Sequence, residues 1–193
     1  MNIQPITLEG QTIRLEPLHH RHAADLTEAA EPILFQHHFI VPEISVSGFE
    51  RYIDTINNRP ASLAFAQVLQ ETGKAVGCTT YMDIQALHRG LEIGSTWLAK
   101  AWQGTRVNPE AKYLLLRHAF DDQDALRVQL KTDSRNTQSQ RAIEKLGAVK
   151  EGVLRNHIIM PDGYIRHTVL YSITREEWPQ VRAGLEARLG ISS

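Results

Sequence analysis

Residues 103–108, with the sequence QGTRVN, have the composition and setting of an anion-binding loop. They follow an apolar segment and precede Pro109 and Glu110, which favour the first turn of a helix. The first backbone N–H groups of a helix have no partner within it, and the helix dipole is positive at that end. We therefore predict that residues 103–108 bind an anion, that Asn108 caps the helix, and that Arg106 could add a charged contact.

The elements that position this loop belong to one domain over residues 1–193, because the length and the 42% of hydrophobic residues suit a single globular core. The net charge of −1 excludes a general attraction to nucleic acid or to an anionic membrane surface. The single cysteine, Cys78, excludes an internal disulfide and fits a reducing cytosol. We find no signal peptide and no apolar run of membrane-spanning length, so we expect a cytoplasmic protein without membrane or nucleic-acid partners.

Hydrophobic periodicity predicts a chain in which strands and helices alternate. Strands are expected within 11–18, 62–69, 74–84, 91–98, 126–132, 149–159 and 164–173, and helices within 18–30, 47–56, from 108 onward, 136–147 and 176–189. The three consecutive strands joined by short turns must be antiparallel, whereas the two single-helix crossovers imply that the strands on either side of each crossover run parallel. The fold class is therefore α/β with a mixed sheet.

Several local patterns make sharper predictions. Ser47 and Glu50 form a capping box for the helix within 47–56. Strict alternation along 91–98 would place one set of residues on one face of the sheet: Leu91, Ile93, Ser95 and Trp97. It would place the other set on the opposite face: Glu92, Gly94, Thr96 and Leu98. Trp97, Trp102 and Cys78 are expected to be core residues.

The order of elements and the block from 91 to 155 resemble the GNAT superfamily of acyl-CoA-dependent N-acyltransferases, and most closely its RimJ/RimL-type branch. The resemblance starts at IRLEPL and includes IGSTWLAKAWQGTRVNPEAKYLLLRHAF and RVQLKTDSRNTQSQRAIEKLGAVKEGVLR. It implies a central, mostly antiparallel sheet that splits between its fourth and fifth strands, 91–98 and 126–132, where the acyl-CoA inserts. It also makes residues 103–108 the pyrophosphate loop, although Arg106 and Asn108 replace the two small residues that are usual there.

The resemblance further implies which residues do the chemistry. Many family members carry a tyrosine that protonates the leaving thiolate, but that position is Ile143 here. The RimL-like branch uses a serine on the first turn of the same helix, which is Ser139, and Glu92 is a candidate base on the strand along the acceptor cleft. Asn136 caps the helix of Ser139 and is expected to contact the coenzyme as well. The expected cofactor-binding residues are Leu98, Gln103, Gly104, Thr105, Arg106, Val107, Asn108, Asn136 and Ser139.

The function that the resemblance implies is transfer of an acetyl group from acetyl-CoA to a primary amine. The acceptor could be the α-amino group of a protein, a polyamine or a small metabolite, and a homodimer is possible. Two alternatives stay open, namely an acyl-CoA-binding sensor or scaffold without turnover, and a transferase that uses another donor such as succinyl-CoA. No metal is expected, because the N-terminal histidines lack partners at metal-site spacing. Residues 37–39 could line the acceptor pocket.

Overall fold

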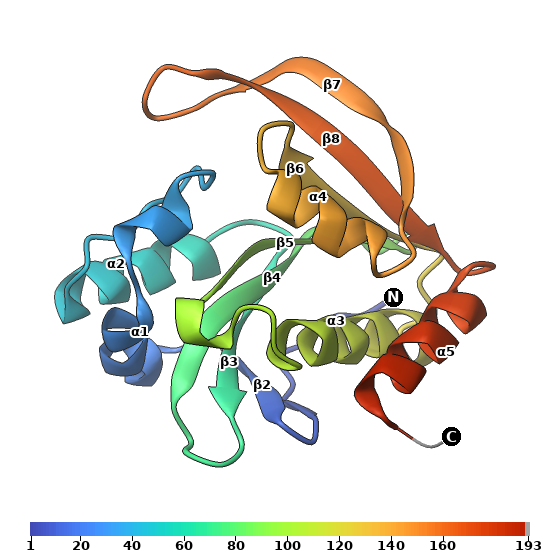
Figure 1. The fold of residues 1–193 in the computed structure, drawn as a ribbon, viewed down its shortest axis with the longest axis horizontal. Helices are drawn as coiled ribbons and strands as arrows, with labels where there is room; N and C mark the ends of the chain where they lie inside the picture. The colour runs from blue at the N-terminus through green and yellow to red at the C-terminus, as the bar shows by residue number, and fades with distance from the viewer. Residues whose placement is uncertain (192–193) are drawn as a thin grey trace.

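The chain forms an eight-stranded sheet with helices on both faces in a computed structural model that describes residues 1–191 (Figure 1). The strands of this described part are β1 (Leu8–Glu9), β2 (Ile13–Pro17), β3 (Leu63–Leu69), β4 (Ala75–Gln85), β5 (Gly90–Leu98), β6 (Arg127–Asp133), β7 (Val149–Ile159) and β8 (Ile165–Thr174). The α-helices are α1 (Ala23–Ala29), α2 (Val46–Asn57), α3 (Val107–Arg117), α4 (Thr137–Glu144) and α5 (Trp178–Leu189). Short helical turns cover His20–His22, Pro32–Phe35, Lys100–Trp102 and His118–Asp122.

The strands lie in the order β1-β2-β3-β4-β5-β6-β8-β7, and within the described chain only β5 and β6 pair in parallel. All the other neighbouring strands are antiparallel. The mixed, mostly antiparallel sheet is thus confirmed, with β1 as an additional short edge strand. The β5–β6 ladder contains only the first residues of the two strands, from Gly90↔Arg127 to Glu92↔Gln129. Beyond them β5 and β6 diverge, which confirms the predicted split.

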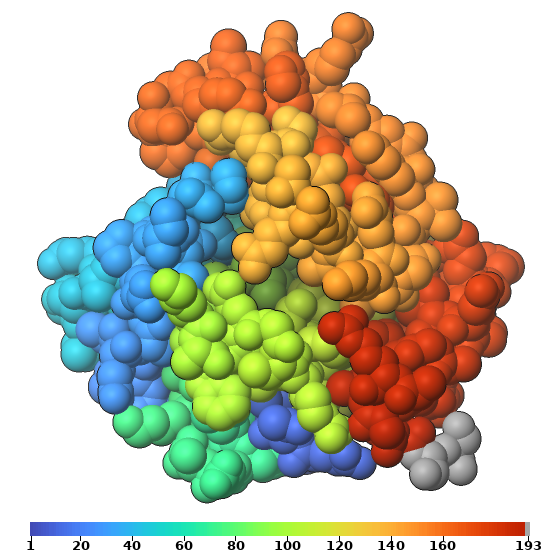
Figure 2. All heavy atoms as spheres, viewed as in Figure 1, coloured from blue at the N-terminus to red at the C-terminus, as the bar shows by residue number. Residues whose placement is uncertain are grey.

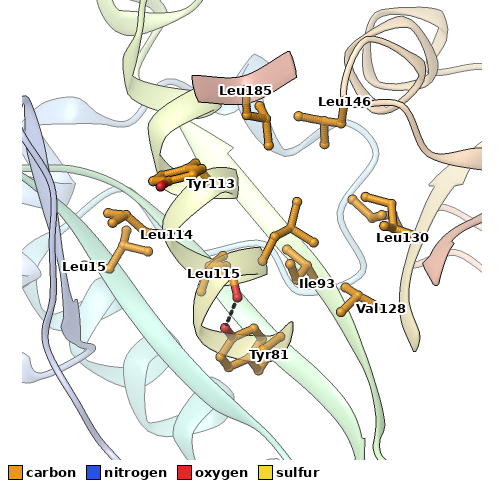
Figure 3. Packing of buried hydrophobic residues seen from close by; sticks show 14 of the residues in the cluster. Leu15, Tyr81, Ile93, Tyr113, Leu114, Leu115, Val128, Leu130, Leu146 and Leu185 are labelled. Carbon is orange, nitrogen blue, oxygen red and sulfur yellow. Dashed lines mark hydrogen bonds between the residues drawn. The ribbon is translucent and has the colours of Figure 1, made fainter. Parts of the chain in front are cut away.

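Each face of the sheet has its own apolar core. Alternate residues of β2 to β6 and β8 pack against α3, α4 and α5, whereas the opposite set from β3, β4 and β5 packs against α1 and α2. Figure 3 shows how the first core runs beneath the split, with Ile93 of β5 beside Val128 and Leu130 of β6. Tyr81 of β4 ties the helix layer to the sheet, because its hydroxyl donates to the carbonyl of Leu115 at 2.5 Å. This continuous core fixes α3 and α4 on the same side of the split.

Strand β5 contains a β-bulge that corrects the predicted alternation of 91–98. Trp97 pairs with Cys78 and Gly94 pairs with Thr80, so Ser95 and Thr96 together lie opposite Thr79. Ser95 has φ 46°, which a regular strand does not contain. The side chains therefore change faces at the bulge. Trp97 packs in the α1–α2 core, whereas Leu98 joins Leu91 and Ile93 in the α3 core.

The helix starts show where local capping rules hold. Ser45, not Ser47, caps α2, because its side chain accepts from the N–H of Gly48 and the helix begins at Val46. Asn136 caps α4 as predicted, with the N–H of Ser139 donating to Oδ1 at 2.9 Å. The predicted core residues Cys78 and Trp97 are buried, while Trp102 is half-buried against the α3 core. The predicted cap of α4 is thus correct, whereas the predicted start of α2 lies two residues too late.

Candidate active site

The split between β5 and β6 leaves two facing strand edges without ladder partners. The ladder ends at Glu92↔Gln129, although β5 continues to Leu98 and β6 to Asp133. Figure 2 shows the surface hollowed between the yellow-green segment that starts α3 and the gold segment that contains α4, with green atoms of the central strands at its floor. Free backbone amides along such an edge can bind an extended amide-containing ligand. The candidate site is therefore this hollow, with the loop 103–108 at its rim.

The loop begins with a tight turn that requires glycine. Gln103 has φ −69° and ψ 145°, and Gly104 has φ 74°. These are the values of the second and third residues of a type II turn, whose third residue must have a positive φ. A Cβ at Gly104 would have no heavy atom within 4 Å, so the restriction comes from the backbone conformation and not from crowding. Gln103 fixes the turn to the strand, because its Nε2 donates to the carbonyl of Leu98 at 3.0 Å.

Helix α3 begins at Val107, and this corrects the prediction that Asn108 is its cap. Arg106 occupies the N-cap position without a capping side chain, and Asn108 is the second helical residue. Pro109 is tolerated at the third position, since the first turn of a helix leaves its N–H groups without internal acceptors. Thr105 Oγ1 accepts from the N–H of Val107 at 3.3 Å. Among residues 1–191, the N–H groups of Gly104, Arg106 and Asn108 have no backbone acceptor, which suits an anion at this end of the helix.

The side chain of Arg106 points toward the two ends of the chain. Its Nη2 donates to the carbonyl of Leu189 at 2.7 Å and to Gln11 Oε1 at 3.1 Å. A cavity of about 250 Å³ lies on this side of the loop, lined by Gly104, Thr105, Arg106, Pro109, Arg188 and Leu189. In this conformation the guanidinium fastens the loop to the C-terminal end of α5. The backbone, rather than this guanidinium, is then the part of the loop that is free to bind an anion.

Helix α4 forms the opposite wall of the hollow. Its first turn carries Ser139, which is half-buried and whose hydroxyl has no hydrogen-bond partner among residues 1–191. Gln138 Nε2 donates to Gln103 Oε1 at 3.3 Å, so the two walls approach each other at the rim. Ile143 is 7% exposed and packs in the α3 core, and it offers no proton donor. The structure thus brings Gln103 of the loop and the first turn of α4 together across the hollow.

Glu92 is buried and belongs to the last ladder pair before β5 and β6 diverge. Its Oε2 lies 2.7 Å from Nζ of Lys131, which is two residues beyond Gln129 on β6. The alternation of β5 places Glu92 on the face opposite α3, because Leu91 and Ile93 pack against that helix. The carboxylate therefore lies on the other side of the sheet from Ser139. A reaction that uses both residues would take place through the split itself.

Several charged residues on that same sheet face were missed by the sequence analysis. We define the acceptor face as the face of β5, β6 and β8 opposite α3–α5, with Glu92, Lys131, Asp133, Arg166 and Thr168 on it. The core of α1 and α2 uses residues of β3, β4 and β5, so the portion over β6 and β8 stays uncovered by these helices. Glu92 was a candidate from the sequence, but no single-strand pattern marks the others, because they come together only through the order of the strands.

The loop after Pro32–Phe35 approaches the acceptor face through His37, while the idea that residues 37–39 line an acceptor pocket stays a prediction. His37 Nδ1 lies 3.9 Å from the carboxylate of Asp133, which in turn accepts from Arg135 at 2.9 Å. The ring of His38 packs edge-on against Phe35, and burial lowers the pKa of His38 to about 4. His38 is therefore neutral at physiological pH. The guanidinium of Arg135 in turn stacks on Tyr164 at 3.3 Å from the ring centroid.

Lys112 of α3 is a second feature without a signal in the sequence. It is 6% exposed, and its Nζ donates to Thr96 Oγ1 at 2.9 Å and to Thr79 Oγ1 at 3.4 Å. No described carboxylate lies within ion-pair distance, and burial lowers the pKa of Lys112 to about 7. This lysine contacts the residues of the β5 bulge from the α3 side. It is therefore adjacent to the strand edge that forms the floor of the hollow.

The surroundings of the N-terminal histidine His22 and of the single cysteine are those of residues that stabilise the fold. Within residues 1–191 no group of three or more His, Cys, Asp or Glu side chains is arranged to hold a metal ion. His22 is instead paired with Glu16 at 3.0 Å. Cys78 is buried, which raises the pKa of its thiol and suits a core residue. Among the described helices, none is both long and apolar enough to cross a lipid bilayer.

Comparison with known proteins gives the family. The family model described as "Acetyltransferase (GNAT) domain" matches residues 12–149, more than half of the chain. The "Putative ribosomal N-acetyltransferase YdaF" of Bacillus subtilis is 27% identical over 106 residues, which are 55% of this chain and 57% of that protein. This chain therefore aligns with little more than half the length of that relative.

Solved structures match over nearly the whole chain. A "putative acetyltransferase" from T. thermophilus has 39% identity and a TM-score of 0.91, covering 98% of this chain and 100% of that one. A GCN5-related N-acetyltransferase from Brucella melitensis has 28% identity and a TM-score of 0.90, covering 96% of this chain and 86% of that one. With its split mixed sheet and these relatives, the chain belongs to the GNAT acetyltransferase family.

Proposed function

We propose that the protein transfers an acetyl group from acetyl-CoA to a primary amine, in a single complex of both substrates. The observation that carries this proposal is the junction at the split, where unpaired edges of β5 and β6 meet the glycine turn and the start of α3. The N–H groups of Gly104, Arg106 and Asn108 would hold the pyrophosphate. The unpaired edge of β5 up to Leu98 would hold the amides of the pantetheine arm.

On the acceptor side, Glu92 is the residue that we assign as the base. An amine is nucleophilic only when neutral, so Glu92 would take a proton from the ammonium, directly or through water. The nitrogen lone pair then forms a bond to the thioester carbonyl carbon, and a backbone N–H of β5 holds the oxyanion that develops. The ion pair with Lys131 holds the carboxylate at the split before the acceptor binds.

On the coenzyme side, Ser139 would assist departure of the thiolate. When the carbonyl re-forms, the C–S bond breaks and the sulfur gains a negative charge. The nitrogen loses its second proton in the same step, and this proton goes to the thiolate, directly or through water, so that the products are the amide and the free thiol. The free hydroxyl of Ser139 can donate a hydrogen bond to this sulfur from the first turn of α4, where the helix dipole also favours negative charge. Ile143 offers no proton at the position where the resemblance implies a tyrosine in many family members.

The branch of the family, the acceptor, the cellular location and the oligomeric state are also part of this proposal. The relative named for ribosomal N-acetylation supports a RimJ/RimL-like enzyme that acts on a protein α-amine or a small amine. We also propose a cytoplasmic location, which the single buried cysteine supports, and a homodimer, which the resemblance to the RimJ/RimL-type branch suggests. A sensor that binds acyl-CoA without turnover and a transferase for another acyl-CoA, such as succinyl-CoA, are the alternatives.

The test combines binding with product analysis. Acetyl-CoA should raise the melting temperature, because a ligand that binds only the native state adds about 2.7 kcal/mol at a hundredfold excess over Kd. Mass spectrometry of a panel of amines after incubation with acetyl-CoA or succinyl-CoA then identifies the product. Stabilisation without any acylated amine would favour a sensor, and no stabilisation by any acyl-CoA would contradict the proposal.

A further inference from the structure

We propose that the acceptor is a primary amine that also carries a carboxylate, and that Arg59 and Arg166 bind this carboxylate beside Glu92. The inference rests on the proposed acetyl transfer and names the substrate class of the same site. It follows from the balance of charges around the split on the acceptor face. Two other charged clusters of the described chain are ion pairs, Arg127 with Glu151 and Arg89 with Asp124.

The cations of the acceptor face differ in whether they have a carboxylate partner. Lys131 is paired with Glu92 at 2.7 Å, and Arg135 is paired with Asp133 at 2.9 Å. Arg166 has no described carboxylate at ion-pair distance, and its Nε donates only to Thr168 Oγ1 at 3.0 Å. Two ion pairs therefore neutralise four of the charges on this face. The positive charge of Arg166 has no carboxylate of its own at ion-pair distance.

Arg59 is a second guanidinium without a carboxylate, and it approaches the split from the other side. It follows the end of α2, and its Nη1 donates to Ser95 Oγ at 3.3 Å and approaches Met82 Sδ at 3.5 Å. Ser95 is the bulge residue of β5, whereas Thr168 lies on β8 beyond β6. One uncompensated guanidinium therefore lies on each side of the split.

Glu92 lies between these two arginines. Its carboxylate and that of Asp133 are near enough to raise the pKa of Arg166, although burial has the larger effect and lowers it. On the other side, Glu92 Oε1 would be 3.0 Å from a Cβ at Gly94, which is adjacent to Ser95. An acceptor that placed its carboxylate on these arginines would therefore bring its amine close to the proposed base.

The chemistry of guanidinium favours a carboxylate at this place. Both arginines are half-buried, and neither forms an ion pair within the described chain. Arg166 is near enough to Asp133 and Glu92 to interact with their charges, but not within ion-pair distance of either carboxylate. The planar guanidinium matches a carboxylate with two parallel hydrogen bonds. A polyamine would bring further positive charge next to Arg59 and Arg166, which opposes its binding. The exposed carboxylate of Asp83 lies on the same side. It accepts from the neutral amides of Gln129 and Gln85 at 3.0 Å and forms no ion pair with either arginine.

The experiment compares matched acceptors with the full chain and acetyl-CoA. β-Alanine is paired with its amide, and the dipeptide Gly-Asp is paired with Gly-Asn, so that a free amino acid can be distinguished from a peptide. Initial rates of coenzyme release give kcat/KM for wild type, Arg166→Gln, Arg59→Gln and the control Arg155→Gln, an exposed arginine on β7 without an ion pair. Comparing the ratio of acid to amide between each variant and wild type cancels the intrinsic difference in reactivity between the two amines.

In wild type we expect the ratio to favour the acid by about 10- to 100-fold, as for hydrogen bonds to charged groups. Arg166→Gln and Arg59→Gln should each reduce the ratio by raising KM for the acid, whereas Arg155→Gln and the rate on the amide should be unchanged. A wild-type ratio near 1, or a preference that survives both substitutions, would overturn the inference. An unaltered affinity for acetyl-CoA shows that the variants are folded.

Failure of the proposed transfer would be distinguishable from failure of this inference. If no amine is acetylated although acetyl-CoA binds, the transfer function is wrong, and calorimetry with β-alanine and its amide still reports on the arginines. Binding of β-alanine to wild type that Arg166→Gln weakens about tenfold or more supports the carboxylate site. Equal binding of acid and amide, or equal binding by wild type and variant, contradicts it.

Discussion

The two ends of the proposed site are built in different ways. At the coenzyme end, residues 103–108 and the first turn of α4 offer backbone N–H groups, a glycine turn and helix ends. At the acceptor end, charged side chains from α2, β5, β6 and β8 meet on one face of the sheet. The first kind of site depends on local backbone geometry, and the second depends on strand order. We expect substitutions at the two ends to separate coenzyme binding from acceptor use.

The largest expected effect is on turnover at the coenzyme end. If Ser139 assists thiolate departure, Ser139→Ala should lower kcat by about 100-fold or more, since general acid catalysis is typically worth about 10²–10⁴-fold. Coenzyme affinity should stay nearly unchanged, because the backbone of Ser139 keeps its bond to Asn136. Steady-state kinetics and calorimetry measure the two quantities. If Ser139→Ala keeps the kcat of wild type, another group must act as the acid, for example Tyr164 or water.

Glu92→Gln should show a different signature at the acceptor end. Removal of a base matters most where the acceptor is an ammonium ion, so the deficit in kcat/KM should shrink as pH rises and the neutral amine becomes abundant. A pH–rate profile with one confirmed acceptor measures this change. A deficit of constant size at every pH would mean that Glu92 positions the acceptor and is not the base.

Between the two ends, Lys112 should reduce stability in a way that depends on pH. Its pKa is about 7 in the folded protein and about 10.4 in an unfolded chain. Between these values the unfolded chain holds the extra proton, so the contribution of Lys112 to the free energy of unfolding rises with pH and is least favourable below pH 7. Lys112→Met should therefore stabilise the protein at pH 7 by a few kcal/mol, on the order of the pKa difference.

The advantage of Lys112→Met should decline between about pH 7 and pH 10.4, where the penalty in wild type disappears. Thr79 and Thr96 keep each other as hydrogen-bond partners at 2.8 Å in the variant. Urea unfolding at several pH values measures the effect, with the exposed Lys145→Met as the matched control. Destabilisation at every pH would mean that the bonds to Thr96 and Thr79 outweigh the cost of burial.

The smallest effect is expected for Arg106→Ala on coenzyme binding. Its guanidinium bonds to Leu189 and Gln11, away from the unpaired N–H groups of the loop. Affinity for the coenzyme should therefore change by no more than about 1 kcal/mol, as for a partly exposed charge. Calorimetry on Arg106→Ala checks this. A loss larger than that of Gly104→Val would show that the side chain turns to the anion and that the backbone is secondary.

The local structure of residues 103–108 and of the start of α4 was easier to predict than the charged cluster around Glu92, for a physical reason. Gly104, the helix after it and the cap at Asn136 are set by neighbouring residues, so their patterns are visible within a few positions. Even there, the helix start was misplaced at Asn108, because proline is tolerated through the first turn and does not fix its position. Short-range patterns therefore locate such a site to within about a residue or two.

The acceptor end could not be predicted from local patterns. Lys131 and Glu92 are paired only because β5 and β6 are neighbours, and Arg166 joins them through β8, whose place beside β6 no short pattern specifies. The bulge at Ser95 also reversed the faces of Trp97 and Leu98, so strict alternation failed where the strands split. Bulges are frequent next to functional sites, and this one directs Thr96 toward Lys112.

The most direct test of the division between the two ends is one calorimetric comparison. Coenzyme A and pantetheine, which lacks the pyrophosphate, are titrated into wild type, Gly104→Val and Arg166→Gln. We predict that coenzyme A binds wild type and Arg166→Gln much more tightly than pantetheine does. This difference should fall by tenfold or more in Gly104→Val, because a β-branched residue resists φ 74° at a cost of about 1–3 kcal/mol. A difference that persists in Gly104→Val, or disappears in Arg166→Gln, would contradict the assignment of the pyrophosphate to residues 103–108.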